Sequence, residues 1–157
     1  MIKVLINGYN GKMGQMVLNQ IKASQDFECI GGTDISLSIN EITEKPDVII
    51  DFSTPEASLS ILQYAEKNKI PVVIATTGFS DEQTAKIKKY SKTLPIFKSA
   101  NMSYETNLMI ALVSKLAKEL TGSDIEIVET HHNKKVDAPS GTALMIADGI
   151  NEALDHE

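Results

Sequence analysis

The sequence predicts an α/β protein with a doubly wound parallel sheet, and three observations support this fold class. Short apolar runs typical of buried strands alternate with longer segments that have helical periodicity. A glycine-rich turn joins the first apolar run to the first helical segment. Polar residues follow the apolar runs, at the carboxyl ends of the strands where parallel sheets bind ligands.

The first element is an apolar run at residues 2–7, which leads directly into a glycine-rich turn at residues 8–14. Met13, Val17 and Ile21 then recur at helical spacing and predict a helix to about residue 24. The glycines follow the pattern G-x-x-G-x-x-G, which allows a pyrophosphate to approach the backbone and the helix N-terminus. The segment indicates a Rossmann-like dinucleotide-binding turn, and a purely structural turn is the alternative.

A second predicted strand, residues 27–33, ends at Asp34, 20 residues beyond Gly14. An acidic residue at this place accepts hydrogen bonds from an adenine-ribose diol and repels a 2′-phosphate. We therefore expect NADH to bind at least as well as NADPH. A simple turn aspartate is the alternative interpretation.

The middle of the chain repeats the strand–helix alternation. Thr54 and Pro55 are typical of a helix start, and Ser80 with Gln83 forms a predicted capping box. The predicted strands are residues 47–52, 71–75 and 95–100. One helix is predicted from residue 55 to about 68, and a second begins at residue 81. A third is predicted from the segment after Ser103 to about residue 120, with Leu108, Leu112 and Leu116 on one stripe.

The most informative stretch spans residues 129–143, between an alternating apolar run at 124–130 that predicts a strand and a predicted helix at 143–150. Ser140 or Thr142 is expected to cap this helix, so that the amides of Gly141 and Thr142 attract an anion.

The same stretch carries three side chains that can donate a proton, His131, His132 and Lys135. Together with the anion-binding helix start they suit an acid–base step on an acidic substrate. The alternative is a basic surface loop before an ordinary capped helix.

Composition bounds the function. The 157 residues are 42% hydrophobic and 23% charged, which is ordinary for a soluble globular protein. The net charge of −6 argues against general binding to nucleic acid or to a membrane surface, and no apolar run is long enough to span one, so a cytoplasmic location is expected. Cys29 is expected to be a buried thiol, and we expect no metal site.

Five motifs in order along the chain carry a resemblance to a known family. They are residues 8–14, Asp51-Phe52-Ser53, residues 75–79, Ser99-Ala100-Asn101 and the block from 129 to 143. The chain resembles the 4-hydroxy-tetrahydrodipicolinate reductases, also called dihydrodipicolinate reductases, over its whole length. The block from 129 to 143 is the most specific of the five motifs.

The resemblance implies that NADH or NADPH reduces 4-hydroxy-tetrahydrodipicolinate, a small cyclic dicarboxylate of lysine and diaminopimelate biosynthesis. It implies a dinucleotide-binding domain at residues 1–103 and a partial α+β substrate domain at 104–157, in a homotetramer. The implied proton donors are His131 and Lys135. The implied cofactor-binding residues are Gly8, Tyr9, Asn10, Gly11, Lys12, Met13, Asp34, Ala75, Thr76, Thr77, Ser99, Ala100, Asn101 and Met102. The implied substrate-binding residues are His132, Lys135, Ser140, Gly141 and Thr142.

The sequence departs from the family pattern at three places. Ile35 stands where an arginine is common after the acidic residue, and Ala75 replaces a glycine before the paired threonines. The sequence also stops at Glu157, where members of the family continue into further strands. A second hypothesis is therefore a non-catalytic NAD(P)-binding module or an inactive fragment of the enzyme, which would bind the cofactor without oxidising it.

Overall fold

A computed structural model describes residues 1–133, 135 and 138–154. The chain divides into two compact units, Met1–Ser99 and Ala100–Glu157, and each is described by itself. Residues 134, 136 and 137 of the expected acid–base block lie outside the described residues. The functional boundary expected between residues 103 and 104 stays a prediction.

The first unit is built on a five-stranded parallel sheet in the order β2-β1-β3-β4-β5. This order confirms the doubly wound architecture, because the chain starts in the interior of the sheet and extends to both edges. The strands are β1 (Ile2–Asn7), β2 (Phe27–Thr33), β3 (Val48–Asp51), β4 (Val72–Ile74) and β5 (Ile96–Lys98). The helices are α1 (Lys12–Ala23), η1 (Ile39–Glu41), α2 (Pro55–Asn68) and α3 (Asp81–Tyr90).

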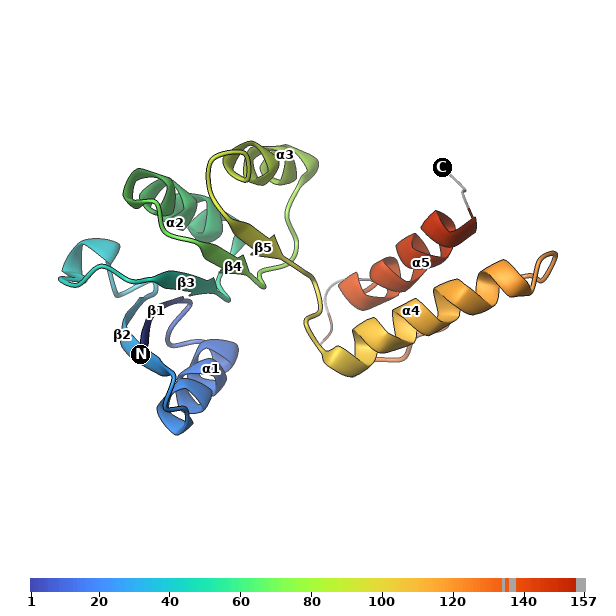
Figure 1. Cartoon of the computed structure of the whole chain (residues 1–157), viewed down its shortest axis with the longest axis horizontal. Coiled ribbons are helices and arrows are strands. Elements are labelled where there is room, and N and C mark those ends of the chain that lie inside the picture. The colour runs from blue at the N-terminus through green and yellow to red at the C-terminus, as the bar shows by residue number, and fades with distance from the viewer. Residues whose placement is uncertain (134, 136–137, 155–157) are drawn as a thin grey trace. The chain divides into compact units, whose positions relative to one another are not determined.

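Helices cover both faces of the sheet, with α1 on one face and α2 and α3 on the other (Figure 1). Alternate residues of β1 face opposite sides, so Leu5 packs toward α2 while Val4 and Ile6 pack toward α1. Each fully buried aliphatic side chain contributes about 1.5–3 kcal/mol of hydrophobic stabilisation. The larger core joins Leu5, Ile49, Ile61, Leu62, Ala65, Ile70, Val72, Ile74, Ile87 and Leu94.

The local signals in the sequence are confirmed at the helix starts. The Thr54 hydroxyl accepts a hydrogen bond from the Ala57 N–H at 3.4 Å with Pro55 in the first turn, and Ser80 and Gln83 form the capping box. Cys29 is half-buried, not fully buried as expected, because it lies on β2 at the edge of the sheet.

A buried carboxylate, Asp51, organises the carboxyl end of the sheet. It accepts hydrogen bonds from Asn7 Nδ2 at 2.7 Å, Ser53 Oγ at 2.5 Å, Thr76 Oγ1 at 3.0 Å and the Ser58 hydroxyl. These five residues, called the Asp51 network, join the ends of β1, β3 and β4 to the first turn of α2. A buried charge is tolerated because several donors replace the water that it loses on folding.

The second unit contains α4 (Tyr104–Glu119) and α5 (Gly141–Leu154) among its described residues. The two helices pack closely, since a Cβ at Gly149 would lie 2.8 Å from Ile110 Cγ2. The predicted stripe of Leu108, Leu112 and Leu116 lies on α4 and is exposed.

The strand expected at residues 124–130 is wrong, because this segment is irregular. Alternating apolar residues form a strand only with a hydrogen-bonded partner, and no described residue of this unit supplies one. No helix in the described part of the chain is long and apolar enough to cross a membrane.

The Asp51 network generates a stability prediction. We expect Asp51→Ala to lower the free energy of unfolding by about 3–5 kcal/mol, because it leaves the buried hydroxyls of Ser58 and Thr76 without their acceptor. Urea unfolding followed by far-ultraviolet circular dichroism measures this change. Asp47→Ala, which removes an exposed carboxylate at the opposite end of β3, is the control and should cost clearly less. Equal costs for the two variants would contradict the prediction.

Candidate active site

The glycine-rich turn folds so tightly that side chains are excluded from it. Gly8 has φ 83°, and a Cβ there would lie 2.3 Å from the Phe52 carbonyl oxygen. A Cβ at Gly14 would lie 2.2 Å from the Gly8 carbonyl oxygen, so α1 starts directly against the turn. The Gly8 N–H donates to the Thr33 carbonyl oxygen at 2.8 Å, which ties the turn to the end of β2.

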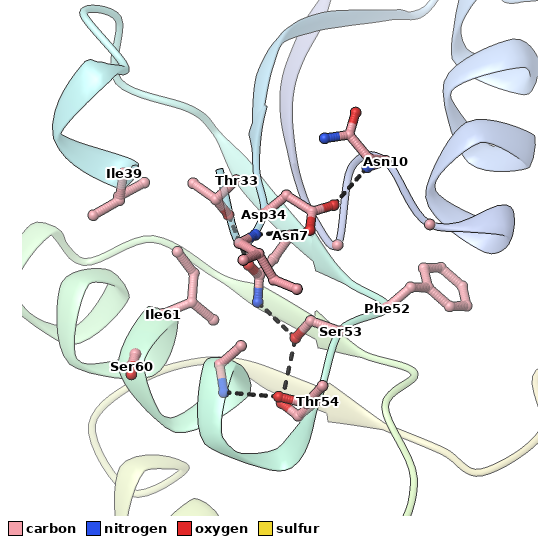
Figure 2. Close-up of a pocket in the computed structure, with 14 residues that line it drawn as sticks. Asn7, Asn10, Thr33, Asp34, Ile39, Phe52, Ser53, Thr54, Ser60 and Ile61 are labelled. Carbon is pink, nitrogen blue, oxygen red and sulfur yellow. Dashed lines mark hydrogen bonds between the residues drawn. The ribbon is translucent and has the colours of Figure 1, made fainter. Parts of the chain in front are cut away.

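A pocket of about 610 Å³ opens beside this turn, over the carboxyl ends of β1, β2 and β3 (Figure 2). We call it the sheet-edge pocket. One part is polar, with Asn10 and Asp34, and another is apolar, with Ile35, Ile39 and Ile61. Its complete lining is Asn7, Gly8, Asn10, Gly11, Thr33, Asp34, Ile35, Ile39, Phe52, Ser53, Thr54, Ala57, Ser60 and Ile61. A ligand with a flat apolar ring and neighbouring hydroxyl groups fits this division.

Asp34 points toward the glycine-rich turn (Figure 2). Its Oδ2 accepts a hydrogen bond from the Asn10 N–H at 2.7 Å, and its Oδ1 accepts one from the Ile35 N–H at 2.7 Å. A carboxylate offers about four lone-pair sites, so two remain for a ligand. The carboxylate thus holds the turn in place and keeps capacity for a pair of hydroxyl donors.

Three expected cofactor-binding residues of the glycine-rich turn lie outside this pocket. The Tyr9 ring packs under β2, where a Cβ at Gly32 would lie 2.1 Å from Tyr9 Cδ2. Lys12 and Met13 are exposed in the first turn of α1 and are not part of the lining. The sheet-edge pocket therefore brings together Gly8, Asn10, Gly11 and Asp34 from the expected set.

The expected residues after β4 and β5 lie farther along the same edge of the sheet. Thr76 is buried, and its hydroxyl donates to Asp51 and accepts from the Ser53 N–H at 3.0 Å. The Ala75 N–H donates to the Asp51 carbonyl oxygen at 2.9 Å, while Thr77 is exposed. The Ser99 N–H donates to the Ile74 carbonyl oxygen at 3.2 Å. The Thr76 hydroxyl therefore supports the site and is not presented to a ligand.

The second unit places its expected site residues around the start of α5. The Ser140 hydroxyl accepts a hydrogen bond from the Ala143 N–H at 3.1 Å, so Ser140 is the N-cap of this helix. The Thr142 hydroxyl instead accepts from Asn101 Nδ2 at 2.9 Å. A Cβ at Gly141 would lie 3.0 Å from the Ala100 Cβ, and Met102 is exposed. Asn101, expected on the cofactor side, and Thr142, expected on the substrate side, are thus direct neighbours.

Glu129 links the expected proton donor to this helix start. Its Oε1 accepts from the Ser140 N–H at 2.8 Å, and its Oε2 lies 2.8 Å from His131 Nε2. We call these three residues the Glu129 clamp. The hydrogen bonds from the Ser140 hydroxyl and backbone N–H, together with the one from His131, lower the pKa of Glu129 to about 2.

The other two expected proton-donating residues, His132 and Lys135, follow His131 in the sequence. His132 is exposed, its carbonyl oxygen accepts from the Lys135 N–H at 3.1 Å, and Lys135 is half-buried. The chain therefore carries cationic or proton-donating side chains shortly before Gly141 and Thr142 in the sequence, and Glu129 links one of them, His131, to the start of α5. Such groups can hold an anion and exchange a proton with it. No group of residues in the described ranges is arranged to hold a metal ion.

Known protein families match both units of the chain. The sequence family described as "Dihydrodipicolinate reductase, N-terminus" matches residues 2–102, and "Dihydrodipicolinate reductase, C-terminus" matches residues 106–157. The chain belongs to the dihydrodipicolinate reductase family.

Individual members of the family are similar over nearly the whole chain. A protein named 4-hydroxy-tetrahydrodipicolinate reductase from Caldanaerobacter subterraneus subsp. tengcongensis is 50% identical over 98% of this chain and 65% of its own length. The protein of the same name from Clostridium botulinum is 45% identical over 100% of this chain and 66% of its own. The chain thus spans about two thirds of the length of these relatives.

A solved structure shares the fold. The dipicolinate-bound dihydrodipicolinate reductase from Paenisporosarcina sp. TG-14 has a TM-score of 0.74 and 30% sequence identity, and covers 98% of this chain and 66% of that one. The family and the Rossmann-like fold indicated by the sequence motifs are therefore confirmed.

Sequence reasoning missed two sets of residues. It gave no site role to the apolar wall of the sheet-edge pocket, because Ile35 and Ile39 lie in what looked like a plain connection and Ile61 lies on the helix expected from residue 55. It also gave no role to Glu129, although an acidic residue two positions before a histidine was a usable signal.

The Glu129 clamp generates a pH prediction. Because the pKa of Glu129 is lowered from the usual glutamate value of about 4.3, the clamp contributes stability above that pH, and the contribution disappears as pH falls through about 2. A carboxyl carbon titration by nuclear magnetic resonance measures this pKa. Ser140→Ala removes the hydroxyl donor and should move the titration of Glu129 upward. An ordinary glutamate titration in the unsubstituted protein would contradict the prediction.

Proposed function

We propose that this chain supplies the cofactor pocket and the acid–base loop of a 4-hydroxy-tetrahydrodipicolinate reductase. In this reaction NADH or NADPH reduces 4-hydroxy-tetrahydrodipicolinate to tetrahydrodipicolinate, the hydroxyl group leaves as water, and the product enters lysine and diaminopimelate biosynthesis. The match to both halves of the family pattern carries the proposal. The dipicolinate bound to the related reductase from Paenisporosarcina sp. TG-14 supports a small dicarboxylate as substrate.

The sheet-edge pocket fits the adenosine half of the cofactor. The nicotinamide supplies a hydride when it is bound. The chain's own residues bind and orient the dinucleotide: the glycine-rich turn admits the pyrophosphate because it excludes side chains, and Asp34 keeps two acceptor sites for the ribose hydroxyls. Ile39 and Ile61 offer apolar surface to the adenine ring. The nicotinamide contacts expected from Thr77, Asn101 and Met102 stay part of the proposal.

The loop before α5 performs the acid–base work in this proposal. The amides of Gly141 and Thr142 hold a substrate carboxylate, and His132 and Lys135 add positive or hydrogen-bonding groups. His131 or Lys135 gives the proton that accompanies hydride arrival, a contribution of about 10²–10⁴-fold in such reactions. Ser140 supports this cluster through the N-cap and the Glu129 clamp. A homotetramer and a cytoplasmic location stay predictions.

Cofactor choice is the first test. We expect NADH to bind at least as well as NADPH, since Asp34 repels a 2′-phosphate, with Lys12 offering one cation in compensation. Asp34→Ala should weaken NADH binding by about tenfold or more, because a hydrogen bond to a charged group contributes about that much to affinity. The same variant should weaken NADPH binding less. Fluorescence titration with both cofactors measures this, with Asp26→Ala, an exposed carboxylate before β2, as the control. A strong preference for NADPH would show that Lys12 outweighs Asp34.

The acid–base assignment is the second test. In a version of the protein that turns over, His131→Gln or Lys135→Ala should lower kcat by about 10²-fold or more and leave NADH affinity unchanged. Thr142→Val keeps the amide but removes the hydroxyl that accepts from Asn101, so it should loosen the start of α5 and mainly raise KM, as expected for weakened ground-state binding. The assay follows the absorbance of reduced nicotinamide with freshly generated substrate.

Two outcomes count against these assignments. Near-parental kcat in both His131→Gln and Lys135→Ala would remove them from the proton step. Cofactor binding without oxidation, in this chain and in any longer version of the reading frame, would favour a non-catalytic NAD(P)-binding module.

A further inference from the structure

We propose that Glu129 is a positioning residue, which selects the ring nitrogen of His131 that exchanges a proton and fixes its place relative to the start of α5. This role rests on the proposed function, in which His131 is a proton donor and the α5 amides hold a carboxylate. The observation behind it is the pair of hydrogen bonds that one carboxylate makes to His131 and to Ser140.

The first step concerns the state of the ring. An ionised carboxylate accepts hydrogen bonds and cannot donate them. Glu129 is ionised across the ordinary pH range, since its pKa is about 2. The nitrogen that faces it, Nε2 of His131 at 2.8 Å, therefore carries a hydrogen. Nδ1 is left as the nitrogen that gives or takes a proton.

The second step follows the proton. A protonated His131 that donates from Nδ1 becomes the neutral imidazole with its hydrogen on Nε2, and this is the form that Glu129 stabilises. The proton that leaves Nδ1 ends on the substrate, and solvent restores it afterwards. The carboxylate itself neither gains nor loses a proton in this sequence.

The third step concerns geometry. Both oxygens of one rigid carboxylate are used at 2.8 Å, one for the ring and one for the N–H of the N-cap Ser140. The ring and the first turn of α5 are therefore held at a set separation. The Asn101 side-chain amide also donates a hydrogen bond to the Thr142 hydroxyl at 2.9 Å, which helps to hold the start of α5 in place. A carboxylate held by the Gly141 and Thr142 amides would thus meet the His131 ring in one orientation.

The test reads the ring directly and needs no turnover. The full chain with isotope-labelled histidine is studied by nitrogen–hydrogen correlation spectra at about pH 9, above the usual histidine range. The His131→Gln variant assigns the signals. We expect the neutral His131 ring to carry its hydrogen on Nε2.

Glu129→Gln gives the decisive comparison, because a Gln side chain has one acceptor oxygen for two donors. If the oxygen stays with the Ser140 N–H, the amide NH₂ faces Nε2, which must then accept. We expect the Nε2–H signal to be lost and an Nδ1–H signal to replace it. Glu129→Asp keeps a carboxylate and should retain most of the Nε2–H form.

Two control variants separate this effect from a general disturbance. Glu126→Gln removes the same charge from an exposed position three residues earlier and should leave the ring unchanged. Ser140→Ala disturbs the cap of α5 but leaves the carboxylate facing the ring, so the Nε2–H form should persist. Circular dichroism verifies that each variant keeps its helices.

In a version that turns over, Glu129→Gln should lower kcat at least about tenfold with NADH affinity unchanged, since a wrong histidine tautomer costs up to about 10⁴-fold. An Nδ1–H ring in the unsubstituted chain, or an unchanged Nε2–H ring in Glu129→Gln, would overturn the positioning role. Absence of reduction by every version of the protein would instead overturn the proposed function, while the ring spectra still report on Glu129.

Discussion

The carboxyl end of the sheet in the first unit depends on one buried carboxylate, that of Asp51. Asp51 has no exposed surface, and hydrogen-bond donors from β1, β4 and the start of α2 converge on it. Asn7 relays this arrangement to β2, because its Oδ1 accepts from the Thr33 hydroxyl at 2.7 Å. Four neighbouring strand ends are thereby aligned at one level. The glycine-rich turn and the first turn of α2 inherit their positions from this alignment, and the sheet-edge pocket lies between them.

The second unit also uses a carboxylate to hold neighbouring groups in place, but this carboxylate is partly exposed to solvent. The Glu129 side chain is 26% exposed, yet both of its oxygens are occupied by His131 and Ser140. Asp51 sets the shape of a pocket through uncharged donors, whereas Glu129 acts on a side chain that can itself titrate. The two carboxylates illustrate how burial suits a structural role and partial exposure suits a role beside proton transfer.

Local signals in the sequence were sufficient for much of the fold. The boundaries of β1, β2 and α2, the Pro55 helix start and the Ser80–Gln83 capping box depend on neighbouring residues and were predicted closely. The strand at residues 124–130 was wrong, because a strand depends on partners that local alternation does not reveal. The roles assigned to the site residues stay predictions, but part of their placement follows from the sequence. Spacing placed Gly8, Gly11 and Asp34 in one pocket. It could not reveal that the Thr76 hydroxyl is committed to Asp51, or that Glu129 takes up the Ser140 amide, because both contacts follow from tertiary packing.

The contact between Tyr9 and Gly32 limits the substitutions that this chain can accept. The Tyr9 ring occupies the volume that any side chain at position 32 would need. Position 32 lies on β2, outside the glycine-rich turn, yet a larger residue there would displace a residue inside the turn and shift the amides on either side of it. The two positions are therefore sterically coupled: a bulkier residue at 32 would fit only with a smaller one at 9, and enlarging position 32 alone would shift the glycine-rich turn.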